Sequence, residues 1–247
     1  MELKGKTAIV TGSSGRLGFL IAKALGQAGC NCLCHYHSNK HRAEALAGQI
    51  RALGARSLAV QADLTEPDGI EKLFNKAGQF GPPQILINSA AVFSKQLLTE
   101  VTFEEAQKVL NLNLTAAILT SREFAKIINT EFPEASAAVG KIINIADVGG
   151  IRPWAGYVLY SSSKAGLIGA TKALAKELAP AICVNSVAPG VITWADEPDE
   201  SAKRRQLLFI PAGRFGEPAE IAEAVIFLLG NDYITGQVLN VDGGRCI

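Results

Sequence analysis

The sequence predicts an α/β fold: a single doubly wound domain, residues 1–247, with a parallel sheet of about seven strands and helices on both faces. Two observations lead to this prediction. Short apolar runs alternate with longer segments of helical periodicity along the whole chain, and the short runs are apolar at successive positions. Strands that are linked through helices run parallel, and strands that are buried on both faces are apolar throughout.

The elements follow from the same alternation. The apolar runs place strands near 6–11, 31–36, 56–61, 84–88, 140–146, 182–187 and 238–241. The periodic segments place helices near 16–28, 40–53, 67–79, 102–130, 157–179 and 218–230. Residues 132–140 are expected to form a surface loop. Residues 194–216 break the pattern with prolines and mixed charge, and we expect a substrate lid there, near the carboxyl ends of the strands.

Composition narrows the class of partner. The chain has 247 residues, 48% of them hydrophobic, and a formal charge of +1, which suits one domain with a sizeable core. Near-neutral charge without a basic stripe argues against nucleic acid. No apolar run approaches the ~18 residues that a membrane span needs, and no signal peptide is apparent. We therefore expect a soluble, cytoplasmic protein that acts on a small molecule.

Three cysteines alternate along the second predicted strand: Cys30, Cys32 and Cys34, with His35 and His37 just beyond. Side chains two positions apart on a strand share a face at intervals of ~6.6 Å. Thiolates with that spacing cannot converge on one metal ion, so we expect buried free thiols that act as small hydrophobic groups, and no metal site.

The strongest chemical signal is Tyr160 followed four positions later by Lys164. On a helix these two side chains share one face. An ammonium within ~6 Å of a phenol favours the phenolate and is expected to lower the tyrosine pKa, which makes the hydroxyl usable as an acid or base near neutral pH. A carboxylate, Asp147, lies thirteen residues before the tyrosine.

A glycine-rich turn joins the first strand to the first helix. Glycine there lets the backbone approach a pyrophosphate, which the amides at the helix N-terminus then bind. The residues of this turn that we expect to hold a dinucleotide are Gly12, Ser14, Arg16, Leu17 and Gly18.

The end of the second strand indicates which dinucleotide. An enzyme that uses NAD usually carries an acidic residue at this point for the ribose 2′-hydroxyl, and none is present. Arg16, His37, Ser38 and Lys40 instead offer donors and positive charge to a 2′-phosphate. We therefore expect NADPH, with Tyr36, His37 and Ser38 near the adenosine ribose.

Taken together, these residues resemble the short-chain dehydrogenase/reductase family across essentially the whole chain. The resemblance implies a Rossmann-like fold with strand order 3-2-1-4-5-6-7, catalysis by Tyr160 and Lys164, and a homotetramer. It also implies that Asn113 holds a water that links Lys164 to solvent. Further cofactor contacts implied by the family's motifs are Asp63, Leu64, Asn88, Ser89, Ala90, Pro189, Gly190 and Ile192.

Three departures from the family pattern narrow the resemblance to one subgroup of the family. Asp147 stands where the family has a serine, Arg16 replaces the middle glycine of the turn, and a His-Tyr-His segment ends the second strand. These features resemble the pteridine and dihydromonapterin reductases. Against that subgroup, Val92 holds the position of the residue that stacks on the pterin, and Ser38 replaces an arginine. The substrate residues implied are Asp147, Phe93, Tyr157 and Trp194.

The charge of Asp147 keeps three functions open. An ionised carboxylate would repel a developing alkoxide and raise the pKa of Tyr160, which disfavours ketone reduction. A protonated carboxyl, or a substrate that gains a proton on a ring nitrogen, removes this conflict and favours the reduction of a pterin by NADPH. The alternatives are a general carbonyl or 3-oxoacyl-thioester reductase, and a non-catalytic NADP(H)-binding protein.

Overall fold

A computed structural model describes residues 1–192 and 200–247. Its centre is one parallel seven-stranded sheet in the order β3-β2-β1-β4-β5-β6-β7, which confirms both the predicted fold class and the strand order. The strands are β1 (Thr7–Val10), β2 (Asn31–Tyr36), β3 (Ser57–Gln61), β4 (Ile85–Asn88), β5 (Gly140–Ile145), β6 (Ile182–Pro189) and β7 (Val238–Val241).

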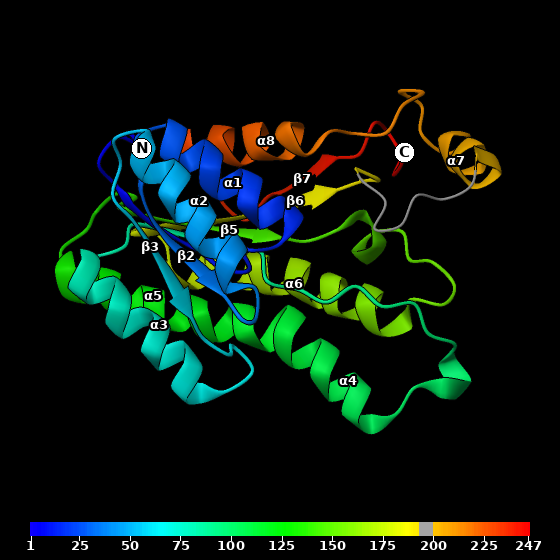
Figure 1. The fold of residues 1–247 in the computed structure, drawn as a ribbon, viewed down its shortest axis with the longest axis horizontal. Coiled ribbons are helices and arrows are strands. Elements are labelled where there is room, and N and C mark those ends of the chain that lie inside the picture. The colour runs from blue at the N-terminus through cyan, green and yellow to red at the C-terminus, as the bar shows by residue number, and fades with distance from the viewer. Residues whose placement is uncertain (193–199) are drawn as a thin grey trace.

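Helices cover both faces of the sheet (Figure 1). They are α1 (Arg16–Gln27), α2 (Lys40–Ala52), α3 (Pro67–Phe80), α4 (Phe103–Leu110), α5 (Ala116–Glu131), α6 (Val158–Glu177), α7 (Glu200–Leu207) and α8 (Pro218–Gly230). The apolar sides of α1, α2 and α8 form one core with one face of the sheet, and those of α3, α5 and α6 form a second core with the other face. The strands are apolar along their length because both faces are buried.

Two predicted segments differ from the structure. The helix expected over 102–130 is interrupted by a π-helical turn, Asn111–Thr115, between α4 and α5. An extra residue in a helical turn leaves no periodicity signal of its own, and such turns occur mostly at functional sites. The expected irregular lid includes an eight-residue helix, α7, which its mixed charge concealed; residues 193–199 lie outside the described part of the chain.

The other sequence expectations for the fold are met. Residues 132–139 form turns and loop between α5 and β5. Cys30, Cys32 and Cys34 are free and buried, and burial raises the pKa of each thiol, to about 11 for Cys30 and Cys34. Within residues 1–192 and 200–247, no helix combines the length and apolarity that crossing a membrane requires.

Candidate active site

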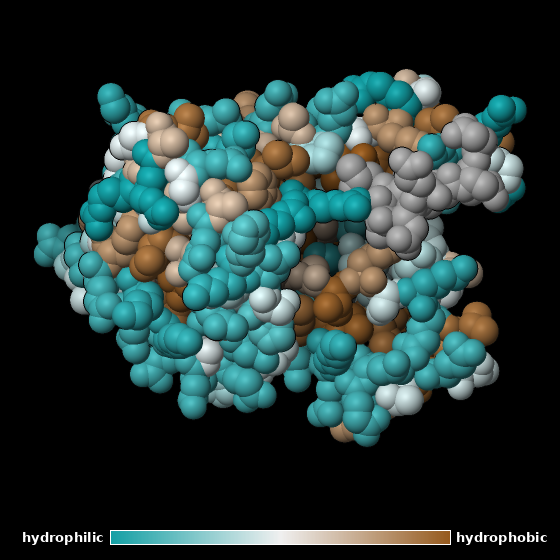
Figure 2. Space-filling model, in the orientation of Figure 1, coloured by the Kyte–Doolittle hydropathy of each residue, from teal (hydrophilic) through white to brown (hydrophobic). Residues whose placement is uncertain are grey.

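The site lies where the strand order reverses. β1 has β2 on one side and β4 on the other, so the crossovers leave its carboxyl end in opposite directions and open a crevice there. Figure 2 shows a hollow on this side of the molecule with hydrophobic residues along it. The segments that reach this edge are the glycine-rich turn, the segment after β4, the segment after β5, and the start of α6.

The glycine-rich turn fits a pyrophosphate. Gly12 has a φ of +64°, and a Cβ at this position would lie 2.7 Å from the Cα of Ala90. At Gly18, a Cβ would lie 2.5 Å from the carbonyl oxygen of Gly12. Gly15 is the N-cap residue of α1, and it has no side chain that could accept a hydrogen bond from the amides of the first turn. At a helix N-terminus these amides are the donors that bind phosphate. Larger residues at Gly12 or Gly18 would close this cradle.

His35, which the sequence reasoning did not place in the site, holds the turn from β2. Its Nδ1 accepts a hydrogen bond from the amide of Gly12 at 3.0 Å, and its Nε2 donates to the carbonyl oxygen of Ala62 at 3.1 Å. Its carbonyl oxygen accepts from both the amide and the hydroxyl of Ser13. Burial lowers the pKa of His35 to about 4, so the ring is neutral. A histidine inside an otherwise apolar strand was the available signal.

Of the predicted 2′-phosphate residues, His37 and Ser38 directly follow β2, Lys40 begins α2, and Arg16 begins α1. His37 is exposed and its Nε2 lies 3.5 Å from Oδ2 of Asp63, the residue predicted to contact adenine. The hydroxyl and amide of Thr65 donate to Asp63 and hold the pKa of that carboxyl below its usual value. Ser38 is exposed, whereas the Tyr36 side chain is buried and can serve the ribose only through its backbone.

The segment after β4 is fixed by two neighbours. The Thr11 hydroxyl oxygen accepts from the amides of Ser89 and Ala90, at 2.9 and 3.1 Å. The side chain of Asn88 is buried in a polar network and donates to Oδ1 of Asn144 at 2.9 Å. These contacts hold the three residues predicted to meet the cofactor, but they place the Asn88 side chain inside the fold.

Asn113 lies in the π-helical turn, and its side chain binds the segment after β4 at Val92. Its Oδ1 accepts from the Val92 amide, and its Nδ2 donates to the Val92 carbonyl oxygen, both at 2.9 Å. Nδ2 also donates to the hydroxyl of Ser163 at 3.1 Å. Both amide protons of the side chain are therefore used, so the predicted water link cannot take a proton from this amide.

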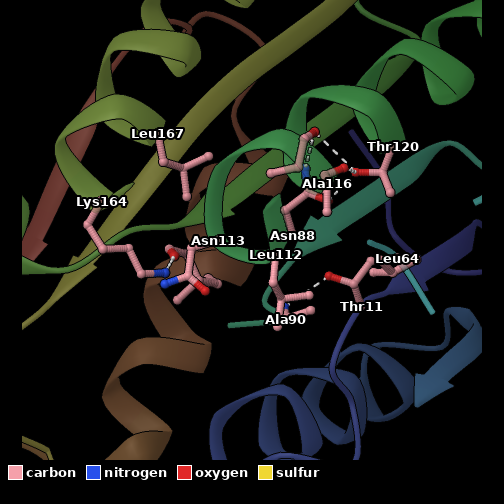
Figure 3. A pocket seen from close by; sticks show the side chains of 12 residues that line it. Thr11, Leu64, Asn88, Ala90, Leu112, Asn113, Ala116, Thr120, Lys164 and Leu167 are labelled. Carbon is pink, nitrogen blue, oxygen red and sulfur yellow. Dashed lines mark hydrogen bonds between the residues drawn. The ribbon is translucent and has the colours of Figure 1, made fainter. Parts of the chain in front are cut away.

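Asn113 and Lys164 both line a small cavity (Figure 3). Its volume is about 10 Å³, which is close to the space that one water needs. The two side chains lie next to each other in this view, and the Lys164 ammonium donates to the carbonyl oxygen of Ile145 at 2.7 Å. The proton link from Lys164 through this cavity remains a prediction.

Helix α6 places Tyr160 and Lys164, the predicted catalytic pair, close together. The Nζ of Lys164 lies 5.8 Å from the centre of the Tyr160 ring, and both side chains are buried. The hydroxyl of Tyr160 donates to Oδ2 of Asp147 at 2.9 Å. The other carboxylate oxygen accepts from the Gly149 amide at 2.6 Å.

The electrostatics correct one expectation. The pKa of Tyr160 is raised, because the phenol is buried and because Asp147 opposes its ionisation, so the expected lowering by Lys164 is wrong for this structure. Burial lowers the pKa of Lys164 to about 8. Burial also raises the pKa of Asp147, against the opposing effects of Gly149, Tyr160 and Lys164. When Asp147 takes up a proton, its charge no longer opposes the phenolate.

Aromatic rings form one wall beside Tyr160. The ring of Phe93 stacks on Tyr157 with centroids 5.0 Å apart and meets the Tyr160 ring edge-on at 4.7 Å. Trp154, which the sequence reasoning did not select, meets Tyr157 edge-on at 5.8 Å. The predicted substrate residues Phe93, Tyr157 and Asp147 are therefore assembled, whereas Trp194 lies outside the described residues.

The predicted nicotinamide segment follows β6. The Gly190 amide donates to the carbonyl oxygen of Val241 at 2.9 Å, and a Cβ on Gly190 would lie 2.7 Å from the Cα of Asp242. Pro189 ends the strand and Ile192 packs against the first core. This close approach ties the segment to the C-terminal turn.

Comparisons with known proteins show the family of the chain. Residues 12–245 match a family model described as enoyl-(acyl carrier protein) reductase. The 3-oxoacyl-(acyl-carrier-protein) reductase of Synechocystis sp. is 36% identical over 98% of this chain and 97% of its own length. The corresponding enzyme of Aquifex aeolicus is 37% identical over 99% of this chain and 98% of its own length.

Solved structures extend the likeness to three dimensions. A short-chain dehydrogenase from Burkholderia cenocepacia in complex with NADP has a TM-score of 0.90 at 33% identity, over all of both chains. A blue fluorescent protein from a metagenomic library, in complex with NADPH, has a TM-score of 0.89 at 33% identity, again over all of both chains. The chain belongs to the short-chain dehydrogenase/reductase family. It is an oxidoreductase, as the site residues predicted.

Proposed function

We propose that this protein is an NADPH-dependent reductase of 3-oxoacyl thioesters. The observation that carries the proposal is the buried Tyr160 hydroxyl, hydrogen-bonded at 2.9 Å to a carboxyl whose pKa is raised. Full-length relatives named as 3-oxoacyl-(acyl-carrier-protein) reductases support the substrate class. The sequence favoured a pterin as substrate and left a 3-oxoacyl thioester as an alternative. We now prefer the thioester.

The residues that would hold NADPH fit it. The uncapped turn from Gly12 to Gly18 would bind the pyrophosphate, and Arg16, His37 and Ser38 would surround the 2′-phosphate. Ser89, Ala90 and Gly190 would approach the nucleoside through their backbones. Two solved relatives contain NADPH or NADP, which supports the choice. When bound, NADPH supplies the hydride that adds to the carbonyl carbon.

The chain's own residues would handle the proton. Tyr160 would donate it to the carbonyl oxygen, and the positive charge of Lys164 would stabilise the oxygen as charge develops. Asp147 can take the place of a serine only when it is protonated, because a neutral carboxyl donates a hydrogen bond without repelling the alkoxide. The buried setting that raises its pKa favours that form.

NADPH oxidation measured with acetoacetyl thioesters, dihydropterins and small diketones tests the proposal. We expect the thioester to give the highest kcat/KM, and activity to decline as pH rises through the raised pKa of Asp147. A higher kcat/KM for a dihydropterin would overturn the substrate assignment. NADPH binding without turnover of any compound would instead favour a binding protein that has lost its activity.

One observation favours a pterin reductase as the second candidate. Phe93 and Tyr157 form a stacked aromatic wall beside Tyr160 that suits a planar heterocycle. In that case Asp147 would be needed to bind or protonate the ring. Asp147→Ser would then sharply reduce dihydropterin turnover, whereas thioester turnover would be unchanged or improved.

We also propose that the protein is a homotetramer, as its family resemblance implied, and that it is cytoplasmic, as its sequence led us to expect. Large apolar side chains are exposed on the surface of a chain that is otherwise well packed, among them Phe227 on α8 and Phe103 on α4. Light scattering coupled to size-exclusion chromatography would give the mass directly. A monomer of 26.1 kDa would contradict the assembly.

A further inference from the structure

The buried ring of His35 connects two segments on the cofactor side of the site. It lies near the carboxyl end of β2 and is 2% exposed. Its Nδ1 accepts from the amide of Gly12 in the glycine-rich turn, and its Nε2 donates to the carbonyl oxygen of Ala62. Ala62 comes directly before Asp63 and Leu64, which are predicted to contact the cofactor. One imidazole therefore joins the turn after β1 to the segment after β3.

These two contacts are compatible with only one form of the ring. A carbonyl oxygen accepts hydrogen bonds, so the proton lies on Nε2, and a backbone amide donates, so Nδ1 carries none. The carbonyl oxygen of Ala62 thus fixes the tautomer in which Nδ1 can accept from Gly12. Burial lowers the pKa of His35 to about 4, which keeps the ring neutral at neutral pH.

Gly12 links His35 to the phosphate-binding end of α1. Its amide donates to His35, and its carbonyl oxygen accepts from the amide of Gly15, the N-cap residue of α1, at 2.9 Å. Gly12 is therefore held on both sides, at the positive φ that the turn requires. Without Nδ1 the Gly12 amide would be a partly buried donor that has lost its acceptor, which costs free energy unless the turn moves.

We propose that His35 is a positioning residue for NADPH, because its Nδ1 orients the glycine-rich turn through the Gly12 amide. It acts through Gly12 and Gly15 and takes no part in hydride or proton transfer. The inference rests on the proposed placement of NADPH at this turn and is independent of the substrate class. Loss of the acceptor should weaken NADPH binding and leave the chemistry at Tyr160 and Lys164 unchanged.

Two substitutions that each replace one ring nitrogen test the proposal. In His35→Asn the amide oxygen takes the place of Nδ1, whereas the side chain is too short to reach Ala62. In His35→Gln the amide nitrogen takes the place of Nε2, and no acceptor faces Gly12. We expect the dissociation constant of NADPH to rise roughly 5- to 100-fold in His35→Gln, as for an unpaired buried amide, and to stay within about 3-fold of wild type in His35→Asn.

A purely structural role would not separate the two variants. Each loses one of the two hydrogen bonds, so both should be less stable in urea, but only His35→Gln should bind NADPH weakly. Its kcat at saturating NADPH should match that of wild type, with the loss confined to the KM for NADPH. Cys32→Ala, at a buried position of the same strand, is the control, because it should lower stability and leave NADPH affinity unchanged.

The tautomer of His35 can be observed directly by nitrogen NMR. The chain has three histidines, so the imidazole signals of His35 can be assigned by their loss in His35→Asn. At neutral pH we expect a protonated Nε2 and an unprotonated Nδ1. A proton on Nδ1 would leave Gly12 without its acceptor and would overturn the proposal.

The outcomes separate the role of His35 from the proposed function. Wild-type protein that does not bind NADPH would overturn the proposed function. Wild-type protein that binds NADPH, with equal affinities in His35→Asn and His35→Gln or an equal loss in Cys32→Ala, would overturn only the role of His35. Circular dichroism checks folding. Where His35→Gln is unfolded, His35→Leu, which also lacks an acceptor for Gly12, gives the same comparison, and the wild-type nitrogen spectrum still tests the tautomer.

Discussion

The cofactor side of the site and its substrate side are built from different kinds of contact. On the cofactor side, the atoms that shape the site belong to the backbone: Gly12 at a positive φ, the N-terminal turn of α1 without a side-chain cap, and the amides held by Thr11. On the substrate side, the chemistry depends on ionisable side chains, because Asp147, Tyr160 and Lys164 lie together in one cluster. A backbone cradle is insensitive to pH, whereas a buried cluster of ionisable groups depends on where its protons lie.

The largest expected effect is on the substrate side. Tyr160→Phe retains the ring that packs against Phe93 but removes the transferable proton. We expect kcat to fall by roughly 10²- to 10⁴-fold with NADPH affinity retained, as for the loss of a general acid. Steady-state kinetics and a fluorescence titration with NADPH measure the two quantities. The exposed Tyr233→Phe is the matched control, and a Tyr160→Phe enzyme with wild-type kcat would show that another group supplies the proton.

On the cofactor side, the substitution that matches Tyr160→Phe is Gly12→Ala. The new methyl group would lie 2.7 Å from the Cα of Ala90, and alanine at a positive φ costs a further ~1–2 kcal/mol. We expect NADPH affinity to fall at least ~10²-fold and the free energy of unfolding to decrease, by titration and urea denaturation. Gly78→Ala on α3 has nothing within 4 Å and should bind NADPH normally with equal or slightly higher stability. Tight NADPH binding by Gly12→Ala would contradict the backbone cradle.

His35 is the place where the cofactor side does depend on pH. Its pKa falls from 6.5 to about 4 on folding. Between these two values His35 is protonated in the unfolded chain and neutral in the folded chain. Stability is therefore expected to fall by about 3 kcal/mol as pH decreases from 7 to 4. Urea denaturation across this range measures the change. His35→Asn should flatten the dependence, whereas the exposed His41→Gln should keep it; equal slopes in both variants would refute the assignment.

The smallest effect concerns selectivity between cofactors. Arg16→Ala should weaken NADPH binding by about 1.5–3 kcal/mol and leave NADH binding nearly unchanged, because a charge-assisted contact with the 2′-phosphate is lost. Dissociation constants for both cofactors measure the difference. Equal losses would show that Arg16 serves the pyrophosphate or the turn.

The contrast between the two sides also explains what the sequence could predict. Apolar runs and glycine positions report backbone geometry directly, so the sheet, the turn at Gly12 and the Tyr160–Lys164 face of α6 were found. The π-helical turn around Asn113 adds a residue without a periodicity of its own. His35 acts through contacts with segments far away in the chain, and the pKa of Tyr160 depends on burial. Only the folded structure supplies such information.

The central claim is that Asp147 does the work of a serine only as a neutral acid. Its most direct test is the pH–rate profile of acetoacetyl-CoA reduction for wild type and Asp147→Ser. Because the folded pKa of Asp147 is raised, wild-type kcat/KM should decline as pH rises through that pKa. The serine variant should lose this limb and reduce the thioester at least as well at high pH, since no charge opposes the alkoxide. Superimposable profiles for the two enzymes would contradict the claim and make the carboxyl incidental.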